Sequence, residues 1–589
     1  MDMLFMLCFL LVLSSTAGAV PVPSPDRFLK SNLRSSRSSK PQEHLELSYP
    51  LPSDRLTPSC TLTIIHHSFA DTMNSPPFST PYSPPLDCPP PWSSVAVELR
   101  VESSGEQYDR ISGLWLGGVE LLRTSTAEPT ETGIFWKVRK DVTRYSSILA
   151  RSNINVTMML ENIVNDVYTG VYHVDVSLWF YNESVTSEAV RVPSIVRPND
   201  VGVINPQKFT SGFTDSPADL IIPISDNGDR GFWFRVESET DVHVKSIRIP
   251  RNSQRAVLEL YVSFHGNDEF WYSNPPNSYL ETNNLTTGRG NRAYREVFVT
   301  IDGKFVGSEV PFPVLFTGGI NPLFWEPVVA IGAFNLPSYD LDLTPFLGQL
   351  LDSKFHAFRI GVDGGISFWL LNANLHLWLD HGSENVEAKP VVYDNPALSI
   401  VLTDAFKLLD GSFRIKAEKR SQFVGWVSSS SGNLTTIVSQ EIKVNNLITF
   451  SKNGTYKVVK ERIKAKRGTK IHTDAGNVIA HLVTIRRYPL TVITATLPGL
   501  KHDTSLLVTN VSHSMNERCV NGDLSSFVFN SQDSNGWMEI RDHSVLSGEA
   551  TTMQSFNFRD TLGCYSRTVA AHNGRLIVDN TTFSCATST

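Results

Sequence analysis

The sequence has few charged residues and few long apolar segments. Only 19% of its 589 residues are charged, and the net charge of −7 is small for this length. Such a chain has no general electrostatic affinity for nucleic acid. Beyond the N-terminus, no stretch reaches the ~20 apolar residues that a membrane-spanning helix needs. We therefore expect a soluble globular protein with neither nucleic-acid nor membrane partners.

Cysteine is scarce as well. The chain has six, and those beyond the first are Cys60, Cys88, Cys519, Cys564 and Cys585. None shows the CxxC or histidine-rich spacing of a zinc site, so zinc is not expected. No other cofactor is expected either. Cys60 and Cys88 flank a proline-rich stretch that a disulfide would close. Two of the last three can pair, which leaves one thiol over.

The N-terminus has the pattern of a secretory signal. An apolar core at 4–13 precedes small residues at 14–19, which predicts a signal peptide over 1–19. Residues 20–57 begin as a Ser-, Pro- and Arg-rich stretch and are expected to form a flexible or propeptide-like leader. Seven N-x-S/T sequons support the secretory pathway, with an extracellular or vacuolar destination. They lie at Asn155, Asn182, Asn284, Asn433, Asn453, Asn510 and Asn580.

Helical periodicity is also scarce. Short alternating or continuous runs such as VAVELRVES, VYHVDVSLWFY and AVLELYVSFHG are separated by Gly, Pro, Asn and Asp. Many short strands with frequent turn residues are typical of β-sandwiches and jelly rolls. The expected fold class is therefore all-β, and the length predicts three or four domains.

A weak internal repeat refines this picture. YDRISGLWLGGVELL at 108–122 resembles YREVFVTIDGKFVGS at 294–308. Later in each copy, DVTRYSSIL at 141–149 resembles DLTPFLGQL at 342–350. Two matches in the same order indicate two copies of one β-unit.

We place the two copies at 58–196 and 197–382, and a further β-rich C-terminal domain at 383–589. Aligning the aromatic residues sets Asp109 and Arg110 of the first copy opposite Arg295 and Glu296 of the second. Taken alone, such acids are usually exposed charges at strand ends. If both copies present an acid to a shared cleft, the pair could activate water and transfer protons.

Other acidic and aromatic residues have two interpretations each. Glu161 interrupts the apolar stretch MMLENIV, where a carboxylate needs a partner, although a turn or cap residue is the simpler reading. The segment GNDEFWYSNPP, with Glu269 and Trp271, has the composition of a sugar-stacking platform or of an anchored loop. Glu128 and Glu131 lie in a Pro-containing loop, where acids mostly serve solubility.

Two further patterns favour structural roles. His66 and His67 lie in an apolar strand, where a core histidine is the more common finding. The basic run KVVKERIKAKRGTK at 457–470 is punctuated by apolar residues, which favours a solvated strand or helix face over polyanion binding. Its Lys466–Arg467 pair is also a candidate processing site.

Three long stretches resemble the plant peptide-N-glycosidase A family, glycoprotein amidases that remove whole N-glycans. They are QYDRISGLWLGGVELLRTSTAEPTETGIFWKVRKDVTRYSSIL (107–149), GNRAYREVFVTIDGKFVGSEVPFPVLFTGGINPLF (290–324) and IGAFNLPSYDLDLTPFLG (331–348). The likeness covers most of the chain from about residue 58. The family is distantly similar to the bacterial peptide-N-glycosidase F, so the resemblance implies a catalytic unit of two adjacent jelly rolls.

The resemblance also implies site residues. Asp109 would be the primary catalytic carboxylate, in the stretch Tyr108-Asp109-Arg110, and Glu296 and Glu161 would be the other two acids. Tyr108, Arg110, Trp271, Glu269 and Trp325 would contact substrate. The motif INPLFW at 320–325 is followed by Glu326, where the family is expected to have Arg.

The implied reaction cleaves the amide between the innermost N-acetylglucosamine and asparagine. Family members are expected to accept core α1,3-fucosylated glycans on glycopeptides or denatured glycoproteins, to need no metal, and to work in mild acid. Two chains cut from one precursor are also expected. The alternatives are a non-catalytic carbohydrate-binding β-sandwich and an O-glycosyl hydrolase, because paired acids serve glycosidases too.

Overall fold

The computed structural model describes residues 30–31, 40–182, 216–542, 544–561 and 563–584. The expected signal peptide, the start of the leader, the 196/197 boundary and Cys585 lie outside these ranges. The all-β expectation is confirmed, since among the described residues the longest helix has six residues, Asn277–Thr282. The same residues contain no helix with the length and apolarity to cross a membrane.

The first unit is a sandwich of a five-stranded and a four-stranded sheet. The larger sheet has the order β2 (Gln42–Glu43), β8 (Ile134–Asp141), β5 (Ser94–Ser104), β10 (Val171–Tyr181), β3 (Cys60–Phe69). The smaller has the order β4 (Phe78–Tyr82), β9 (Ile154–Leu160), β6 (Ile111–Leu116), β7 (Val119–Ser125). Short helices are η2 (Pro52–Arg55), η3 (Thr143–Tyr145) and α1 (Ser146–Leu149).

The second unit repeats this strand order. One sheet has the order β11 (Leu220–Ile224), β19 (Trp369–Leu379), β14 (Ser253–Phe264), β17 (Ser338–Asp342), with β12 (Phe234–Val236) also beside β19. The other has the order β13 (His243–Ile247), β18 (His356–Asp363), β15 (Glu296–Ile301), β16 (Lys304–Glu309). Short helices are η5 (Gly228–Arg230), η6 (Gly266–Asp268), η7 (Trp271–Ser273), α3 (Asn277–Thr282), η8 (Pro322–Trp325), η9 (Thr344–Phe346) and α4 (Leu347–Leu350).

The sequence repeat corresponds to matching elements in the two units. Its first half forms the β6–β7 and β15–β16 hairpins, whose turns Gly117-Gly118 and Asp302-Gly303 all have positive φ, as two-residue type I′ turns require. Its second half forms η3–α1 and η9–α4. The sandwich architecture follows, whereas the jelly-roll connectivity stays a prediction.

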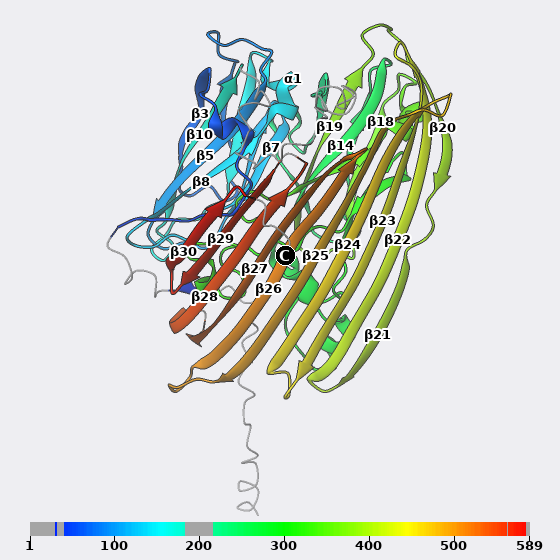
Figure 1. Ribbon diagram of the computed structural model, residues 1–589. Helices are drawn as coiled ribbons and strands as arrows, with labels where there is room; N and C mark the ends of the chain where they lie inside the picture. The colour runs from blue at the N-terminus through cyan, green and yellow to red at the C-terminus, as the bar shows by residue number, and fades with distance from the viewer. Residues whose placement is uncertain (1–29, 32–39, 183–215, 543, 562, 585–589) are drawn as a thin grey trace, which may run out of the picture.

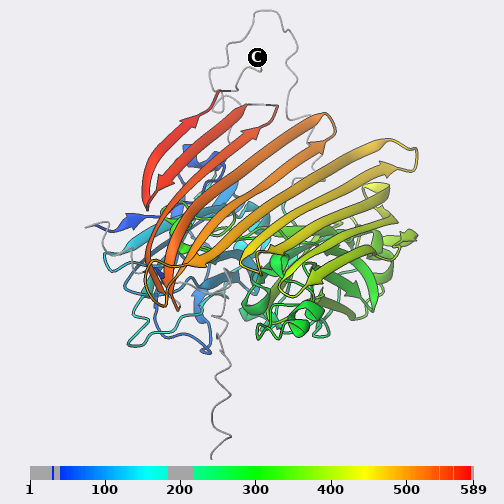
Figure 2. The same ribbon diagram turned by 90° about the horizontal axis from the view of Figure 1, so that it is seen from below.

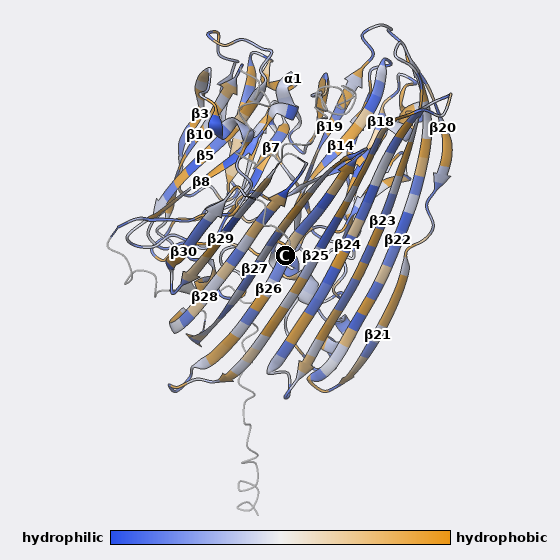
Figure 3. Ribbon diagram, in the orientation of Figure 1, coloured by the Kyte–Doolittle hydropathy of each residue, from blue (hydrophilic) through white to orange (hydrophobic). Residues whose placement is uncertain are grey.

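The C-terminal region forms one 12-stranded sheet that covers both sandwiches (Figures 1 and 2). Its strands are β20 (Glu387–Asp394), β21 (Ser399–Lys407), β22 (Asp410–Ser429), β23 (Gly432–Ser451), β24 (Tyr456–Thr473), β25 (Val478–Pro498), β26 (Ser505–Asn521), β27 (Leu524–Arg541), β28 (Ser544–Arg559), β29 (Cys564–His572) and β30 (Arg575–Thr582), with β1 (Lys30–Ser31) beside β28. Alternating apolar and polar residues give these strands a banded pattern (Figure 3), as expected where one face packs on the sandwiches.

A long loop without strands fills the space between the sandwiches and this sheet. In the 310–336 loop every residue from 310 to 334 is buried. The N-terminal segment fastens it: Leu45 exchanges backbone hydrogen bonds with Pro327 and Val329, and the Glu46 carboxylate accepts three backbone N–H groups at 332–335. From residue 40 onward the expected leader is therefore packed into the fold. Burial, opposed by these three hydrogen bonds, raises the pKa of Glu46 to about 7.

The two sandwiches meet along a buried polar seam centred on Glu259 of β14. Its carboxylate accepts from the Tyr145 hydroxyl at 2.8 Å and lies 3.4 Å from Arg144, both in the first unit. On its own side it accepts from Ser338 and lies 3.1 Å from His376. Burial alone would raise the pKa of Glu259, but Arg144 and His376 outweigh burial and hold that pKa well below its usual range.

A second part of the seam is built on Arg123 and Glu120 of the first unit. The fully buried guanidinium forms a bidentate pair with Glu120 and donates to the Leu370 carbonyl and the Ser263 hydroxyl of the second unit. Each unit therefore supplies partners that the other needs. A buried charged group without its partner is costly, so the seam fixes the relative position of the units.

We predict that Glu259→Gln destabilises the protein by about 3–5 kcal/mol, because it removes the buried charge that pairs with Arg144 and accepts hydrogen bonds from both units. Denaturant unfolding measures this. The control is Asp503→Asn, which changes an exposed pair with His502 at a position with φ of 58° that Asn also tolerates. That variant should lose less than about 1 kcal/mol. Equal losses in both variants would contradict a structural role for the seam.

Candidate active site between the two sandwiches

Asp109 lies at the end of the loop that leads from β5 into β6, and its side chain is half-buried. Gln107 shapes this loop: its side-chain carbonyl accepts from the Tyr108 backbone N–H and from the Arg110 guanidinium, and its amide donates to the Ile163 carbonyl. The Tyr108 ring packs 5.5 Å from the ring of Tyr168. Burial and the nearby Tyr168 and Glu128 raise the pKa of Tyr108 to about 12, so its hydroxyl stays protonated.

Glu128 comes from the segment that follows β7, and it is buried. Backbone hydrogen bonding continues past the β6–β7 hairpin, since Thr126 N–H donates to the Arg110 carbonyl and the Thr126 hydroxyl accepts from Arg110 N–H. The Tyr172 hydroxyl lies within hydrogen-bond distance of the Tyr108 and Ala127 carbonyls. These contacts hold the Asp109 loop and the Glu128 segment side by side.

The two carboxylates meet at a glycine of the second unit. A Cβ added at Gly318 would overlap both Asp109 Oδ1 and Glu128 Oε1, so both oxygens lie against the same backbone atom. The neighbouring Thr317 hydroxyl donates to the Thr126 carbonyl at 2.7 Å, which ties this turn to the first unit. Asp109 and Glu128 are therefore neighbours at the junction of the two sandwiches.

Glu161 directly follows β9, and its carboxylate interacts electrostatically with two guanidinium groups. Burial raises the pKa of its carboxyl, and Arg235 of the second unit and Arg110 lower it. Arg235 also pairs with Glu237 and lies over the Phe368 ring. Three acids of the first unit thus share one junction with Arg110 and Arg235.

The second unit adds an uncharged aromatic wall. His265 lies between the rings of Phe316 and Phe368, at 5.3 and 5.2 Å. Burial, together with Arg123 and Arg235, lowers the pKa of His265 to about 3, so the imidazole is neutral. Its Nε2 lies 3.0 Å from the Ser263 hydroxyl.

Glu296, the expected second catalytic acid, contacts Tyr294 and the C-terminal sheet. It is buried at the start of β15, where it accepts from the Tyr294 hydroxyl at 2.8 Å and from Lys419 of the C-terminal sheet at 2.7 Å. The preceding Arg295 forms a buried bidentate pair with Asp268.

The aromatic segment beside Glu269 is also interior. Trp271 is fully buried against Phe264 and Tyr272, so it offers no ring face to a sugar. Glu269 is buried too, and the next residue, Phe270, lies against Gly319. These residues form the inner support of the site.

Trp325 and Glu326 are buried in the 310–336 loop. The Trp325 indole donates to the Gly319 carbonyl at 2.9 Å, one residue beyond the glycine that meets Asp109. It thereby holds the turn that carries Gly318.

Four further expectations concerned the cysteines, the sequons, the Lys466–Arg467 pair and metal ligands. The Cys60–Cys88 disulfide is confirmed, Cys564 is also disulfide-bonded, and Cys519 has a free thiol. All seven sequon asparagines are exposed. The candidate processing site Lys466–Arg467 lies in the middle of β24, which is hydrogen-bonded to β23 on one side and to β25 on the other. In the described ranges, one cluster has metal-ligand spacing, Cys60, Asp87 and Cys88, and its two sulfurs are already bonded to each other.

Sequence reasoning assigned Glu128 to solubility and did not single out Gly318. Glu128 lies in a stretch where every residue from 111 to 129 is buried, which is unusual for a loop acid, but only the structure shows this. The one available signal was the Thr-Gly-Gly at 317–319, because consecutive glycines often mark a close approach of the backbone.

Residues 48–396 match the family "Peptide N-acetyl-beta-D-glucosaminyl asparaginase amidase A". The chain is 39% identical over 551 residues to the peptide-N4-(N-acetyl-beta-glucosaminyl)asparagine amidase A of Prunus dulcis, covering 92% of this chain and 93% of that protein.

Solved structures are more distant. A crystal structure of a peptide-N(4)-(N-acetyl-beta-D-glucosaminyl) asparagine amidase aligns with 54% of this chain and 96% of its own, at 12% identity and a TM-score of 0.33. PNGF-II aligns with 55% of this chain and 66% of its own, at 12% identity and a TM-score of 0.34.

We predict that Gly318→Ala lowers stability by about 1–3 kcal/mol, because the added methyl group must displace two carboxylates in a packed junction. Thermal unfolding checks this. Gly563→Ala is the matched control, since a Cβ there meets nothing within 4 Å. If Gly318→Ala and the control unfold at the same temperature, Asp109 and Glu128 do not lie against this glycine.

Proposed function

This chain belongs to the peptide N-acetyl-β-D-glucosaminyl asparaginase amidase A family, and we propose how its residues carry out that family's reaction. The enzyme hydrolyses the amide between the innermost N-acetylglucosamine and asparagine of N-glycopeptides. It releases the whole glycan, core α1,3-fucosylated glycans included, and leaves aspartate in the peptide.

One observation carries the proposal: the Asp109 and Glu128 carboxylates lie together against Gly318 where the sandwiches meet. Two carboxyl groups this close favour sharing one proton over carrying two charges. We assign the charged form to Asp109, because it is the more exposed of the two and stands next to Arg110 in the chain. Glu128, which is buried, holds the proton.

The reaction then divides between the two acids. Asp109 removes a proton from the attacking water, whose oxygen bonds to the asparagine carbonyl carbon. As the carbon–nitrogen bond breaks, the proton of Glu128 passes to the departing glycosylamine nitrogen. The glycosylamine later loses ammonia in water. Asp109 and Glu128 therefore exchange protonation states during one turnover.

Arg110 and Glu161 orient the substrate in this proposal. Arg110, fixed by Gln107, presents a planar donor to the developing oxyanion or to a sugar acetamido oxygen. Glu161 accepts hydrogen bonds from sugar N–H or hydroxyl groups; burial raises the pKa of its carboxyl, and Arg235 and Arg110 oppose that rise. The Tyr108 hydroxyl, protonated throughout, is a further donor.

We do not place Glu296 at the reacting centre. Its carboxylate already accepts from Tyr294 and Lys419, and the latter belongs to the C-terminal sheet. These contacts support a structural role, in which Glu296 fastens the second sandwich to that sheet. Trp271 and Trp325, both buried, support the site from behind.

The compartment and the form of the substrate are also part of the proposal. The disulfides and the seven exposed sequon asparagines support passage through the secretory pathway, to the cell exterior or the vacuole. A site at the junction of two domains suits an exposed glycosylated asparagine on a glycopeptide or denatured glycoprotein. Processing into two chains remains a prediction.

We predict that Asp109→Asn lowers kcat by about 10²–10⁴-fold, because it keeps the side-chain shape and removes the general base. Mass spectrometry of a glycopeptide gives the products. An amidase leaves Asp and a glycan with its chitobiose end intact, an O-glycosyl hydrolase leaves sugar on Asn, and a binding protein leaves the glycopeptide unchanged. Glu131→Gln, which changes an exposed acid in the loop that carries Glu128, is the control. Normal release by folded Asp109→Asn would contradict the assignment.

The choice between Glu128 and Glu296 is tested by matched substitutions. We predict that Glu128→Gln lowers kcat by about 10²-fold or more, since the amide cannot supply the proton. Glu296→Gln should leave kcat unchanged and cost about 1–3 kcal/mol of stability, because it weakens the contact with Lys419. The reverse pattern, measured by turnover and denaturant unfolding, would restore Glu296 as the catalytic acid.

A further inference from the structure

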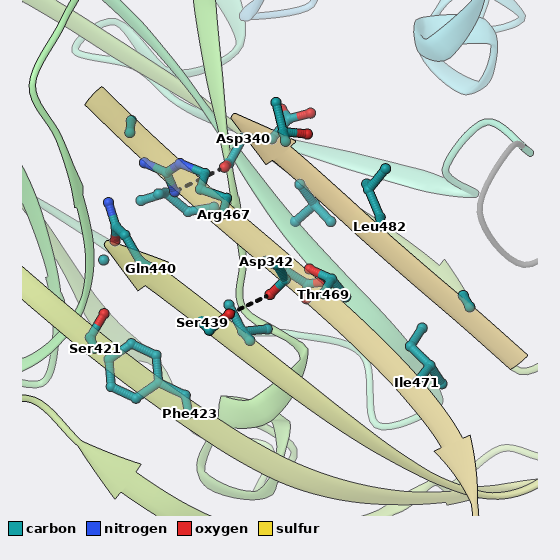
Figure 4. Close-up of a pocket in the computed structure, with 18 of the residues that line it drawn as sticks. Asp340, Asp342, Ser421, Phe423, Ser439, Gln440, Arg467, Thr469, Ile471 and Leu482 are labelled. Atoms are coloured by element: carbon teal, nitrogen blue, oxygen red, sulfur yellow. Dashed lines mark hydrogen bonds between the residues drawn. The ribbon is translucent and has the colours of Figure 1, made fainter. Parts of the chain in front are cut away.

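A pocket lies between the second sandwich and the C-terminal sheet (Figure 4). Its volume is about 390 Å³, which is within the range of small-ligand sites. Two adjoining hollows of about 330 and 200 Å³ share Arg255 with it and extend along Trp378 to Asp219 and His381. Together they form one groove, which no step of the amidase reaction uses.

The floor of the pocket is a regular array on one face of the C-terminal sheet. One row of directly paired residues crosses β22 to β26 and is mostly polar: Ser421, Gln440, Arg467, Thr484 and Cys519. A second row, two residues along, contains three apolar and two polar residues: Phe423, Val438, Thr469, Leu482 and Asn521. Because neighbouring strands are about 4.8 Å apart, hydrogen-bonding groups recur at about the length of a sugar ring.

The opposite wall is an edge of the second sandwich. Asp340 and Asp342 of β17 face β24, where the Arg467 guanidinium donates to the Asp340 carbonyl and the Thr469 hydroxyl lies 3.5 Å from the Asp342 carboxylate (Figure 4). Val306 and Gly307 of β16 complete it. The pocket therefore has polar groups on both sides and apolar surface between them.

The charges that line the pocket are largely neutralised within the protein. Arg467 pairs with Glu309 at 2.6 Å, Arg486 with Glu517 at 2.6 Å, and Asp340 with Arg144 at 3.1 Å. The Asp342 carboxylate accepts from the Thr344 backbone N–H. A charged ligand would have to break these pairs, whereas a neutral ligand rich in hydroxyl groups would add hydrogen bonds to them.

The pocket is far from the proposed reaction centre. Strand β14 joins the two places, with Arg255 in the groove and Phe264 packed beside Phe316 near the Gly318 turn. Nine residues of extended chain span roughly 30 Å. One extended glycan or glycoprotein can therefore reach both sites, and a ligand in the groove does not cover Asp109.

We propose that this groove is a second carbohydrate-binding site, which takes a neutral oligosaccharide. The chemistry fits the distal branches of the glycan being released or another glycan on the same glycoprotein. The proposal rests on the proposed amidase function for its biological use, but the binding itself does not depend on turnover. Binding of an oligosaccharide in this groove would raise the affinity of the enzyme for large glycosylated substrates.

Cys519, a free thiol in the pocket wall, gives a direct readout. We predict that a free oligomannose glycan at ten times its Kd slows alkylation of Cys519 about tenfold, as mass action requires. An unglycosylated peptide should give no protection. The experiment uses the full chain with Asp109→Asn, so its result is independent of catalysis. Unchanged alkylation at saturating glycan, or equal protection by the peptide, would overturn the proposal.

Variants in the groove separate its role from that of the reaction centre. Leu482→Phe fills the pocket, and Thr469→Val removes one hydroxyl with little change of shape. Both should abolish or weaken protection of Cys519 and raise KM for a multiply glycosylated denatured protein, with kcat on a short single-glycan glycopeptide unchanged. Wild-type KM for the glycoprotein in both variants would contradict the proposal. If a whole glycan protects Cys519 in the wild-type groove and a short glycopeptide without distal branches does not, the distal branches are the ligand.

Discussion

The buried seam around Glu259 is the interaction on which the rest of this protein depends. Its carboxylate accepts from Tyr145 of one sandwich and from Ser338 of the other, and Arg123 reaches across to the Leu370 carbonyl. A polar interface of this kind is satisfied in one register only, because any slip leaves charged groups buried without partners. That register brings Asp109 and Glu128 of one unit against Gly318 of the other.

The C-terminal sheet and the N-terminal segment contribute to the site indirectly. The 310–336 loop has almost no regular structure of its own, so its conformation depends on outside contacts. Asn321 donates to Thr509, the Phe324 carbonyl accepts from Thr552, and the Val329 carbonyl accepts from Gln532, all on the large sheet. Glu46 holds the far end of the loop. The C-terminal sheet therefore fixes the turn that carries Gly318, through contacts at other points of the 310–336 loop.

Part of this could be predicted from local chemistry. The repeated hairpins were visible because Gly117-Gly118 and Asp302-Gly303 are turn sequences between apolar runs, and Asp109 stood out as an acid directly before a buried strand. The repeat aligned Glu296 with Asp109, but a repeat reveals equivalent positions and not the contacts around them, which for Glu296 are Tyr294 and Lys419. Trp271 had the composition of a sugar platform, yet its burial comes from packing partners distant in sequence.

The sequence by itself determined the all-β class, the duplicated unit, the disulfide between Cys60 and Cys88 and the family to which the chain belongs, because strand alternation, turn residues and long motifs are local in the chain. Only the tertiary structure decided which acids meet. Glu128 and Gly318 are separated from each other by 190 positions, and Glu296 is drawn instead to Lys419. Contacts of this range depend on how two sandwiches and a sheet pack, which no local pattern encodes.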